Sequence, residues 1–285
     1  MFPTRGSTKE RRNMAHHHGS LLSSVNDFIS KETFTLHYAT FDQALALVAW
    51  HGQNAVMAKL DIKQAFRLCP VHPADLELLG IHWEGQYHIN LRLPFGLHSS
   101  PYLFNCLADA FEWILKNNYM LTDLIHYLDD YFTMAPPNSK TCADDVNITI
   151  HMVSHFVIPL APEKLEGPTT SLVFLGILID TNRMETALTE DKLKELLAEL
   201  QCWCSRKKCL KHELLSLIGK LNWACRVIPV GCIFLCRLID RSTTARLPHH
   251  HISMNLEARR DIAWWSRSPD LALFTDASGT LGYGL

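Results

Sequence analysis

Alternating apolar and polar residues over 56–62 predict a short β-strand in the first third of the chain. The alternating positions are Val56, Ala58, Leu60 and Ile62 on one side and Met57, Lys59 and Asp61 on the other. This pattern places Asp61 near the end of the strand, where a carboxylate can reach solvent.

A helical spacing of apolar residues follows Pro101. Ser99 and Ser100 supply a helix N-cap, and proline is favoured at the first helical position. The apolar positions are Leu103, Leu107, Ala110, Phe111 and Ile114. We therefore expect an amphipathic helix that buries one face.

Two apolar arms, 124–128 and 131–134, enclose the pair Asp129 and Asp130 and predict a tight β-hairpin. After a turn-rich segment at 159–168, the continuous apolar stretch 172–179, which contains Gly176, predicts one more buried strand. The first two thirds of the chain thus combine strands with helices.

The pattern then becomes helical. Thr189 can cap a helix with acidic residues in its first turn, and leucines recur at helical spacing along it. A second helix follows over about 210–221. Mixed strands and helices followed by a helical segment, without an internal repeat, predict an α+β domain with a helical appendage.

The composition agrees with a globular protein: of 285 residues, 47% are hydrophobic and 20% are charged. The apolar run at 227–236 is interrupted by Pro229 and Gly231, and it is far shorter than the roughly 20 residues of a membrane-spanning helix. The N-terminus has no apolar stretch typical of a secretory signal. We expect an intracellular chain without a membrane partner, with nucleus and cytoplasm not distinguished.

The nine cysteines are an odd number without the spacing of a disulfide framework, so we expect reduced thiols. Cys202, Cys204, Cys209 and His212 offer an alternative zinc site. We disfavour it because structural zinc sites usually combine two closely spaced pairs and because these positions overlap helical sequence.

The net charge of −2 argues against a protein that coats nucleic acid indiscriminately, yet the segment 206–260 is strongly basic. Its acidic residues are only Glu213, Asp240 and Glu257. Its basic residues are Arg206, Lys207, Lys208, Lys211, Lys220, Arg226, Arg237, Arg241, Arg246, Arg259 and Arg260. This segment either holds a phosphate backbone or is a solvated helical face.

Two adjacent aspartates inside an apolar hairpin are costly, because desolvated carboxylates lose hydration and repel each other. A cation would offset this cost, and carboxylates are hard oxygen ligands suited to Mg²⁺. Asp61 supplies the third acid that a two-metal site requires. Because neighbouring residues of a strand point to opposite faces, we expect Asp129 to be the closer ligand. The alternative is an exposed Asp-Asp turn without metal.

Four ordered motifs resemble the palm motifs of retroelement reverse transcriptases. They are LDIKQAF at 60–66, LPFGLHSSP at 93–101, YLDD at 127–130 and FLG at 174–176. SVND at 24–27, LIGKL at 217–221 and Ile228-Pro229 are most similar to the tyrosine-recombinase retrotransposons of the DIRS group. The resemblance implies a right-hand polymerase palm, an antiparallel sheet with helices, with partial fingers and a helical thumb. Its parts would be fingers over 1–55, palm over 56–182, thumb or connection over 183–262, and the truncated start of an RNase H domain over 268–285.

The resemblance also implies an RNA-directed DNA polymerase in which a primer 3′-hydroxyl attacks the α-phosphate of a dNTP. Asp61, Asp129 and Asp130, with the backbone carbonyl of Ile62, would hold Mg²⁺, or Mn²⁺ as an alternative. Lys164 would protonate the departing pyrophosphate, unless it is merely an exposed lysine paired with Glu166. The partners implied are an RNA template, a DNA or RNA primer and dNTPs.

The same resemblance assigns residues to nucleotide binding. Gln64, Ala65 and Phe66 would line the site, with Phe66 excluding a ribose 2′-hydroxyl; the alternative for Phe66 is an ordinary core position. Phe95 and Gly96 occupy the place of a nucleotide-contacting Gln-Gly pair, and Gly96 permits close backbone approach. Arg12 resembles the fingers arginine that grips the triphosphate.

Residues 271–278 resemble the opening strand of an RNase H, with Asp276 as its first metal ligand. No Asp or Glu follows Asp276, so we expect no RNase H activity from this chain alone. The chain also looks cut short at both ends. Two other functions stay open: an inactive retroelement remnant that at most binds nucleic acid, and an RNA-templated RNA polymerase, which Phe66 disfavours.

Overall fold

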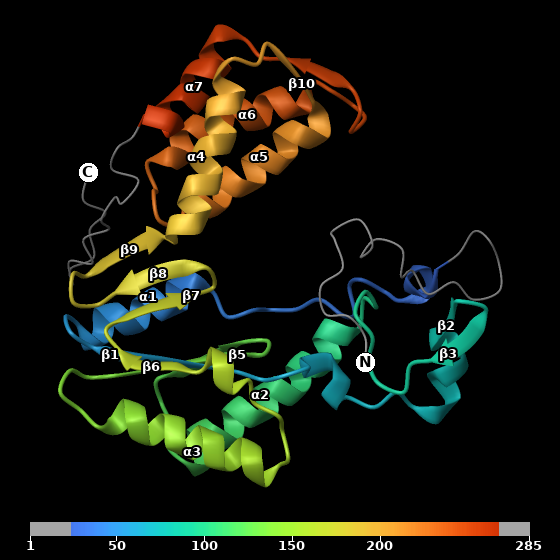
Figure 1. Ribbon diagram of the computed structural model, residues 1–285, viewed down its shortest axis with the longest axis vertical. Coiled ribbons are helices and arrows are strands. Elements are labelled where there is room, and N and C mark those ends of the chain that lie inside the picture. Colours follow the sequence, from blue (N-terminus) through green and yellow to red (C-terminus); the bar gives the residue numbers. More distant parts are fainter. Residues whose placement is uncertain (1–23, 268–285) are drawn as a thin grey trace. The chain divides into compact units, whose positions relative to one another are not determined.

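The computed structural model describes residues 24–267 and divides the chain into two compact units (Figure 1). Within the described residues, the first unit consists of 24–47, 57–135 and 139–168. The second consists of 48–56, 136–138 and 169–267. The predicted division into fingers, palm and thumb is a division by function, and it stays a prediction.

The first unit is built on a four-stranded sheet in the order β4-β5-β1-β6. Its strands are β1 (Val56–Asp61), β4 (Leu124–Tyr127), β5 (Asp130–Ala135) and β6 (Glu166–Thr169). β4 and β5 form the predicted antiparallel hairpin, in which Tyr127 pairs with Asp130. The predicted strand near residue 60 is also confirmed, and its position inside the sheet explains why Met57, Ala58 and Leu60 are buried.

Two helices cover one side of this sheet (Figure 1). They are α2 (Ser100–Asn118), which packs on β4, and α3 (Thr141–His155), which packs on β5. The core between helices and sheet includes Phe104, Leu115, Phe132 and Met152. The helix after Pro101 is confirmed, but the Ser99 side chain makes no capping hydrogen bond. Ser100 is also not a cap, because its hydroxyl donates instead to the Pro94 carbonyl oxygen at 2.8 Å.

A second, smaller cluster of apolar side chains lies around Leu79, Leu93 and Leu97. Short elements surround it: η2 (Val25–Phe28), η3 (Ala65–Leu68), η4 (Pro73–Leu79), and the hairpin of β2 (Gly80–Trp83) and β3 (Gln86–Ile89). Val25, Ile29 and Phe66 pack against this cluster. It therefore joins segments that are up to about seventy residues apart in the sequence.

The second unit begins with a three-stranded antiparallel sheet of β7 (Ser171–Phe174), β8 (Ile177–Asp180) and β9 (Glu185–Leu188). The prediction of one strand over 172–179 is wrong, because the chain reverses in its middle. Leu175 and Gly176 both have positive φ, 48° and 80°, the backbone combination that closes a two-residue hairpin. The apolar pattern did not show this turn, because both arms of the hairpin are buried.

Four helices complete the second unit. They are α4 (Glu190–Cys204), α5 (Lys211–Ala224), α6 (Gly231–Thr243) and α7 (Leu256–Arg267), with a small hairpin of β10 (Lys208–Leu210) and β11 (His251–Ser253). The two helices predicted after Thr189 are α4 and α5. Thr189 occupies the N-cap position of α4, although its hydroxyl makes no capping bond. Leucines 200, 214, 217, 221 and 238, together with Trp265, form the helical core.

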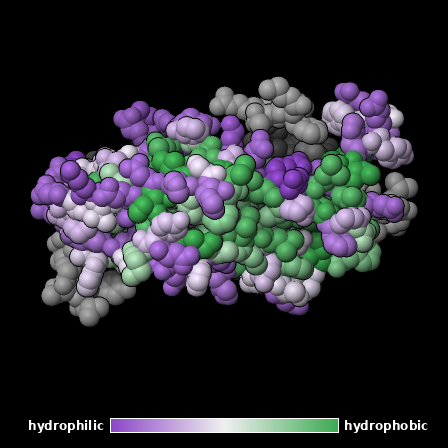
Figure 2. All heavy atoms as spheres, turned by 90° about the horizontal axis from the view of Figure 1, so that it is seen from below, coloured by the Kyte–Doolittle hydropathy of each residue, from purple (hydrophilic) through white to green (hydrophobic). Residues whose placement is uncertain are grey.

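The whole is the predicted α+β class, with antiparallel sheets and helices. No helix within residues 24–267 is long and apolar enough to cross a membrane. The surface nevertheless carries apolar groups, and Figure 2 shows hydrophobic residues gathered over much of the face seen from below. Exposed large side chains of the first unit include Trp83, Tyr87, Trp113, Phe156 and Val157.

Candidate active site

A sharp turn places the two adjacent aspartates. Leu128 and Asp129 connect β4 to β5, and Leu128 has a φ of 53°, in the left-handed region that a branched side chain seldom adopts. The turn is held from outside, because the Ile62 amide donates to the Asp129 carbonyl oxygen at 2.9 Å. Asp129 therefore lies in the turn and Asp130 begins β5, and both aspartates are half-buried.

Asp61 ends the neighbouring strand β1 and is only 6% exposed. The segment 159–164 runs beside this strand end: the Lys63 amide donates to the Pro159 carbonyl oxygen at 2.8 Å, and the Ala161 amide to the Asp61 carbonyl oxygen at 3.0 Å. These bonds bring Lys164, at the end of η5 (Pro162–Lys164), to the Asp61 carboxylate.

Lys164 forms an ion pair with Asp61, in which Nζ lies 2.5 Å from Oδ2. The alternative pairing of Lys164 with Glu166 is wrong, since Glu166 pairs with Lys59 at 2.8 Å. The hydrogen bond to Asp61 raises the pKa of Lys164, and the charges of Asp130 and Asp129 act in the same direction. Lys164 thus carries a firmly held proton directly beside the three acids.

The three carboxyl groups act on one another. Burial, then the charges of Asp129 and Asp61, and a hydrogen bond with the Asp61 carboxyl raise the pKa of Asp130 to about 6. Burial and the charge of Asp61 also raise the pKa of Asp129. The charge of Asp61 thus acts on both hairpin aspartates, which places the three carboxyl groups close together. Which of the two hairpin aspartates lies nearer to a metal stays a prediction.

This site suits a divalent cation by its donor chemistry. Mutual repulsion of half-buried carboxylates is relieved by a cation, and hard oxygen ligands favour Mg²⁺. Across residues 24–267, no three His, Cys, Asp or Glu side chains form a ready-made metal cage. Mg²⁺ does not need one, because it usually keeps several waters and combines one or two carboxylates with substrate phosphates.

The residues predicted to bind the nucleotide form an aromatic wall after β1. Gln64 adopts a left-handed conformation, with φ of 59°, and starts η3, in which Ala65 is buried. The Phe66 ring lies 5.1 Å from the Phe95 ring, centroid to centroid, and 5.9 Å from Phe104. Phe66 also packs against the cluster of Leu79, Leu93 and Leu97, here called the leucine cluster. One side of its ring is therefore part of the core, while its other neighbour, Phe95, is 64% exposed.

Gly96 follows Phe95 with a φ of 93°, which strains any residue that carries a Cβ. Its carbonyl oxygen accepts a 2.7 Å hydrogen bond from the Asn26 side-chain amide. Sequence reasoning missed Asn26 as a site residue. The only signal was its place in the motif at 24–27, and the pattern of polar residues does not show that this motif reaches the loop 70 residues later.

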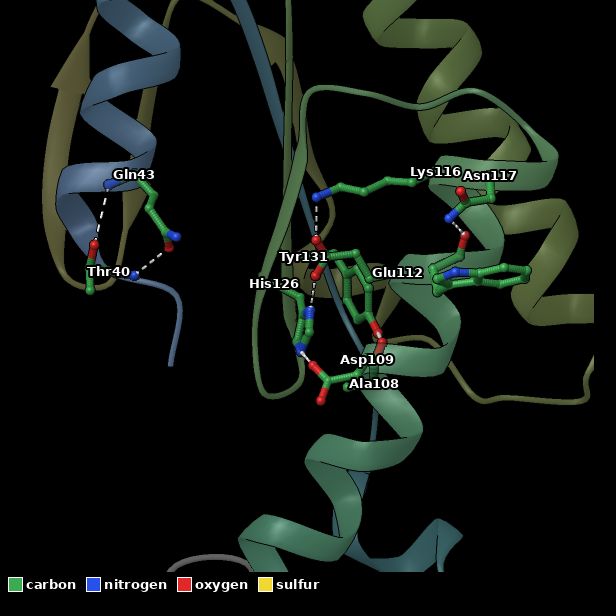
Figure 3. A network of polar contacts seen from close by, with 10 residues as sticks. Thr40, Gln43, Ala108, Asp109, Glu112, Lys116, Asn117, His126 and Tyr131 are labelled. Carbon is green, nitrogen blue, oxygen red and sulfur yellow. Dashed lines mark hydrogen bonds and ion pairs between the residues drawn. The ribbon is translucent and has the colours of Figure 1, made fainter. Parts of the chain in front are cut away.

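A network of polar contacts around the buried His126 connects the hairpin to α2 (Figure 3). His126 on β4 is 6% exposed, and its ring contacts the carboxylates of Glu112 and Asp109 on α2, the latter at 3.4 Å. Glu112 also holds Lys116, and the Tyr131 hydroxyl on β5 donates to the Ala108 carbonyl oxygen at 3.1 Å. The spacing of Asp109, Glu112 and Lys116 along α2 could have predicted a polar face of this helix. It could not have predicted which strand lies against that face.

The network favours the ionised form of Glu112. Burial alone would raise the pKa of Glu112, but the hydrogen bonds from His126 and Lys116 outweigh it, so that the pKa lies below its ordinary value. The network therefore fixes β4 and β5 on α2, directly before and after the turn that carries the aspartates.

Two predicted site residues, Arg12 and Asp276, lie outside the residues that the structure describes. All the other predicted site residues belong to the first unit. They are Asp61, Ile62, Gln64, Ala65, Phe66, Phe95, Gly96, Asp129, Asp130 and Lys164.

Comparison with known proteins agrees with this arrangement. Residues 16–179 match the family model described as reverse transcriptase (RNA-dependent DNA polymerase). No curated protein matches the chain.

Solved structures of the foamy viral protease-reverse transcriptase are similar in fold. The dRH form in complex with double-stranded DNA has a TM-score of 0.59 at 21% identity and covers 81% of this chain and 38% of that chain. The complex with an RNA/DNA hybrid has a TM-score of 0.55 at 20% identity, covering 78% and 28%. A further complex with double-stranded DNA has a TM-score of 0.58 at 20% identity, covering 81% and 44%. The chain thus spans less than half of these viral proteins.

Proposed function

This chain belongs to the reverse transcriptase (RNA-dependent DNA polymerase) family, and we propose that it extends a primer on an RNA template by nucleotidyl transfer from dNTPs. One observation carries this proposal. Asp61 ends β1 beside the turn that carries Asp129 and Asp130, and burial together with the charge of Asp61 raises the pKa of both hairpin aspartates. Such a cluster is costly unless it binds a cation, and it is the cluster that two-metal phosphoryl chemistry requires.

In the proposed mechanism, Asp61, Asp129 and Asp130, with the carbonyl oxygen of Ile62, hold Mg²⁺, or Mn²⁺ in its place. When bound, the metal ions would activate the primer 3′-hydroxyl and stabilise the oxygen that leaves. Lys164 is protonated at neutral pH, as lysines ordinarily are, and would give its proton to the departing pyrophosphate. The contact with Asp61 raises the pKa of Lys164 and so makes it a weaker acid, which is why the ion pair would have to loosen for this step.

Phe66 selects the sugar in this proposal. Its ring is fixed from behind by Phe104 and the leucine cluster, so it cannot easily turn away from a ribose 2′-hydroxyl. Phe95 and Gly96 complete the wall with an apolar ring and a backbone without Cβ. Gln64 and Ala65 begin the same turn, and Arg12 would grip the triphosphate.

The nucleic-acid partners follow from the family and from the relatives, two of which were solved with double-stranded DNA and one with an RNA/DNA hybrid. We propose that residues 1–55 belong to partial fingers, that 56–182 form the palm, and that the helical segment 183–262 acts as a thumb or connection. A retrotransposon of the DIRS group as its origin, an intracellular site of action, and the start of an RNase H domain at Asp276 belong to the same proposal.

Primer extension on a heteropolymeric RNA template with Mg²⁺ and dNTPs tests the proposed function. The purified chain is compared with Asp129→Asn and with a control, Asp144→Asn, which changes an exposed acid on α3. We expect extension by the chain and by the control, and its loss in Asp129→Asn. Absence of extension by a folded chain would contradict the proposal and would favour an inert remnant that at most binds nucleic acid.

A further inference from the structure

Asn26 bridges two points of the loop that carries Phe95. Its side-chain Nδ2 donates to the Gly96 carbonyl oxygen at 2.7 Å, and its Oδ1 accepts from the His98 amide at 2.8 Å. We call this pair of hydrogen bonds the Asn26 clasp. A side-chain amide here does what a neighbouring β-strand would do, since it offers one donor and one acceptor to the same stretch of backbone.

The clasp is itself held in place. Ser24 and Asp27 form a reciprocal capping box around Asn26: the Ser24 amide donates to the Asp27 carboxylate at 2.7 Å, and the Asn26 amide donates to the Ser24 hydroxyl. On either side, Val25 and Ile29 pack against the leucine cluster. The backbone around Asn26 is thus held by its own contacts, so the two hydrogen bonds of the Asn26 side chain restrain the loop.

The other end of the loop is held by α2. Besides the bond from Ser100 to Pro94, the Ser100 amide donates to the Leu97 carbonyl oxygen at 3.2 Å. Between these two attachments lies Gly96 with its φ of 93°, a backbone state that glycine leaves easily when nothing holds it. The Asn26 clasp acts on this residue and on the second residue after it.

We propose that Asn26 is a positioning residue for the nucleotide: it fixes the loop 94–98 and thereby presses Phe95 toward Phe66. This inference rests on the proposed function, because it assigns the clasp to the wall that would receive the base and sugar of a dNTP. Asn26 touches neither the acids nor, in this proposal, the reacting atoms. Its loss weakens nucleotide binding and sugar selection and leaves the chemical step largely intact.

Two variants separate the two hydrogen bonds. Asn26→Ala removes both, and Asn26→Asp keeps the acceptor for His98 but sets a carboxylate oxygen against the Gly96 carbonyl. Asn117→Ala is the matched control, because Asn117 also donates its side-chain amide to a backbone carbonyl, that of Trp113 within α2. Thermal unfolding of all variants identifies any that fail to fold.

Steady-state incorporation of dNTPs and rNTPs gives the decisive values. We expect both Asn26 variants to raise KM for dNTP by roughly five- to thirtyfold, since each net hydrogen bond corresponds to a factor of about two to ten, with kcat changed less than threefold. The preference for dNTP over rNTP falls in parallel. Unchanged KM and sugar preference in a folded Asn26→Ala would overturn the inference.

Amide hydrogen exchange of the peptide around 94–99 tests the Asn26 clasp without requiring turnover. We expect faster exchange at His98 in Asn26→Ala and unchanged exchange in Asn117→Ala; equal protection in both overturns the clasp. A chain without any polymerase activity contradicts the proposed function, whereas an active chain whose Asn26 variants keep the loop protected or keep KM unchanged contradicts only the positioning role.

Discussion

At the scale of single residues, the site depends on a balance between burial and charge. Asp61 is buried and paired with Lys164, while Asp129 and Asp130 are half-buried and repel one another. The position of Asp129 and Asp130 at the turn of a hairpin could be predicted from the sequence, because two apolar arms enclose them. The partner of Lys164 could not, because the choice between Asp61 and Glu166 depends on how the segment 159–164 lies along β1.

The raised pKa of Asp130 predicts a pH-dependent stability in the absence of metal. The native state holds this proton more tightly than the unfolded chain does, so its contribution is fully present below pH about 4 and is lost as pH rises through about 6. A pKa raised from 3.8 to about 6 corresponds to about 3 kcal/mol, which solvent screening reduces to about 1–2 kcal/mol because the carboxyl group is partly exposed.

Asp130→Asn should therefore gain about 1–2 kcal/mol over the original chain at pH 7.5, with the gain shrinking toward pH 4. Urea unfolding in EDTA at several pH values measures this difference. Asp144→Asn should show little change between these pH values. If the free energy of unfolding had the same pH dependence in the original chain and in Asp130→Asn, the raised pKa of Asp130 would be contradicted.

At the scale of elements, the hairpin β4–β5 and the helix α2 form one structural device. The aspartates lie at the end of the hairpin, and the buried His126 network with Tyr131 ties both strands to α2. Helix α2 and the hairpin could be predicted from periodicity. The contacts between them could not, because they join residues 14 to 23 positions apart through polar atoms that no apolar pattern records.

Removing His126 should test this device. His126→Ala removes the imidazole contact from Glu112, which keeps only Lys116, and from Asp109, which keeps only Asn105. It also opens a cavity in a buried position, so we expect a loss of about 2–4 kcal/mol in the free energy of unfolding. Denaturant unfolding at pH 7 measures it. Asn117→Ala, on the exposed side of the same helix, should stay within about 0.5 kcal/mol. A His126→Ala variant as stable as this control would show that the network does not brace the hairpin.

Two glycines of the second unit should respond with opposite signs. Gly176→Ala places a Cβ at a φ of 80°, 2.7 Å from the Lys192 Nζ and 3.4 Å from the Trp223 ring, so we expect a loss of about 1–2 kcal/mol. Gly219→Ala adds a Cβ that meets nothing within 4 Å on helix α5, and we expect a gain of about 0.5–1 kcal/mol.

Thermal unfolding of both glycine variants measures the pair. Equal effects of the same sign would contradict the turn at 175–176, the feature that separates β7 from β8 and that the continuous apolar run at 172–179 concealed.

At the scale of the whole molecule, charge cannot be judged from sequence counts alone. The basic segment 206–260 contains few acids of its own, yet Lys220 pairs with Glu195 and Glu199 of α4, and Arg237 pairs with Asp261 of α7. Part of the predicted phosphate-binding charge is therefore neutralised by acids outside the segment. Lys207, Lys208, Arg226 and Arg246 have exposed side chains.

These exposed residues predict a measurable salt dependence. If Lys207 and Lys208 contact phosphates, the double change to glutamine should reduce the slope of log K against log salt by about 1–2 for a primer-template duplex. Fluorescence anisotropy at several salt concentrations measures the slope. Lys31→Gln with Lys140→Gln, two exposed lysines of the first unit, is the matched control. Equal slopes for both double variants would favour the alternative of a solvated helical face.

Asp61, Asp129 and Asp130 are proposed to form one cation-binding site, and direct metal binding tests this proposal without requiring turnover. Mn²⁺ binding followed by electron paramagnetic resonance, with dNTP present, is measured for the chain, for Asp61→Asn, for Asp130→Asn and for Asp144→Asn. We expect binding by the chain and by Asp144→Asn, and markedly weaker binding by the other two. Equal Mn²⁺ affinity in all four proteins would show that the three aspartates do not form one cation-binding site.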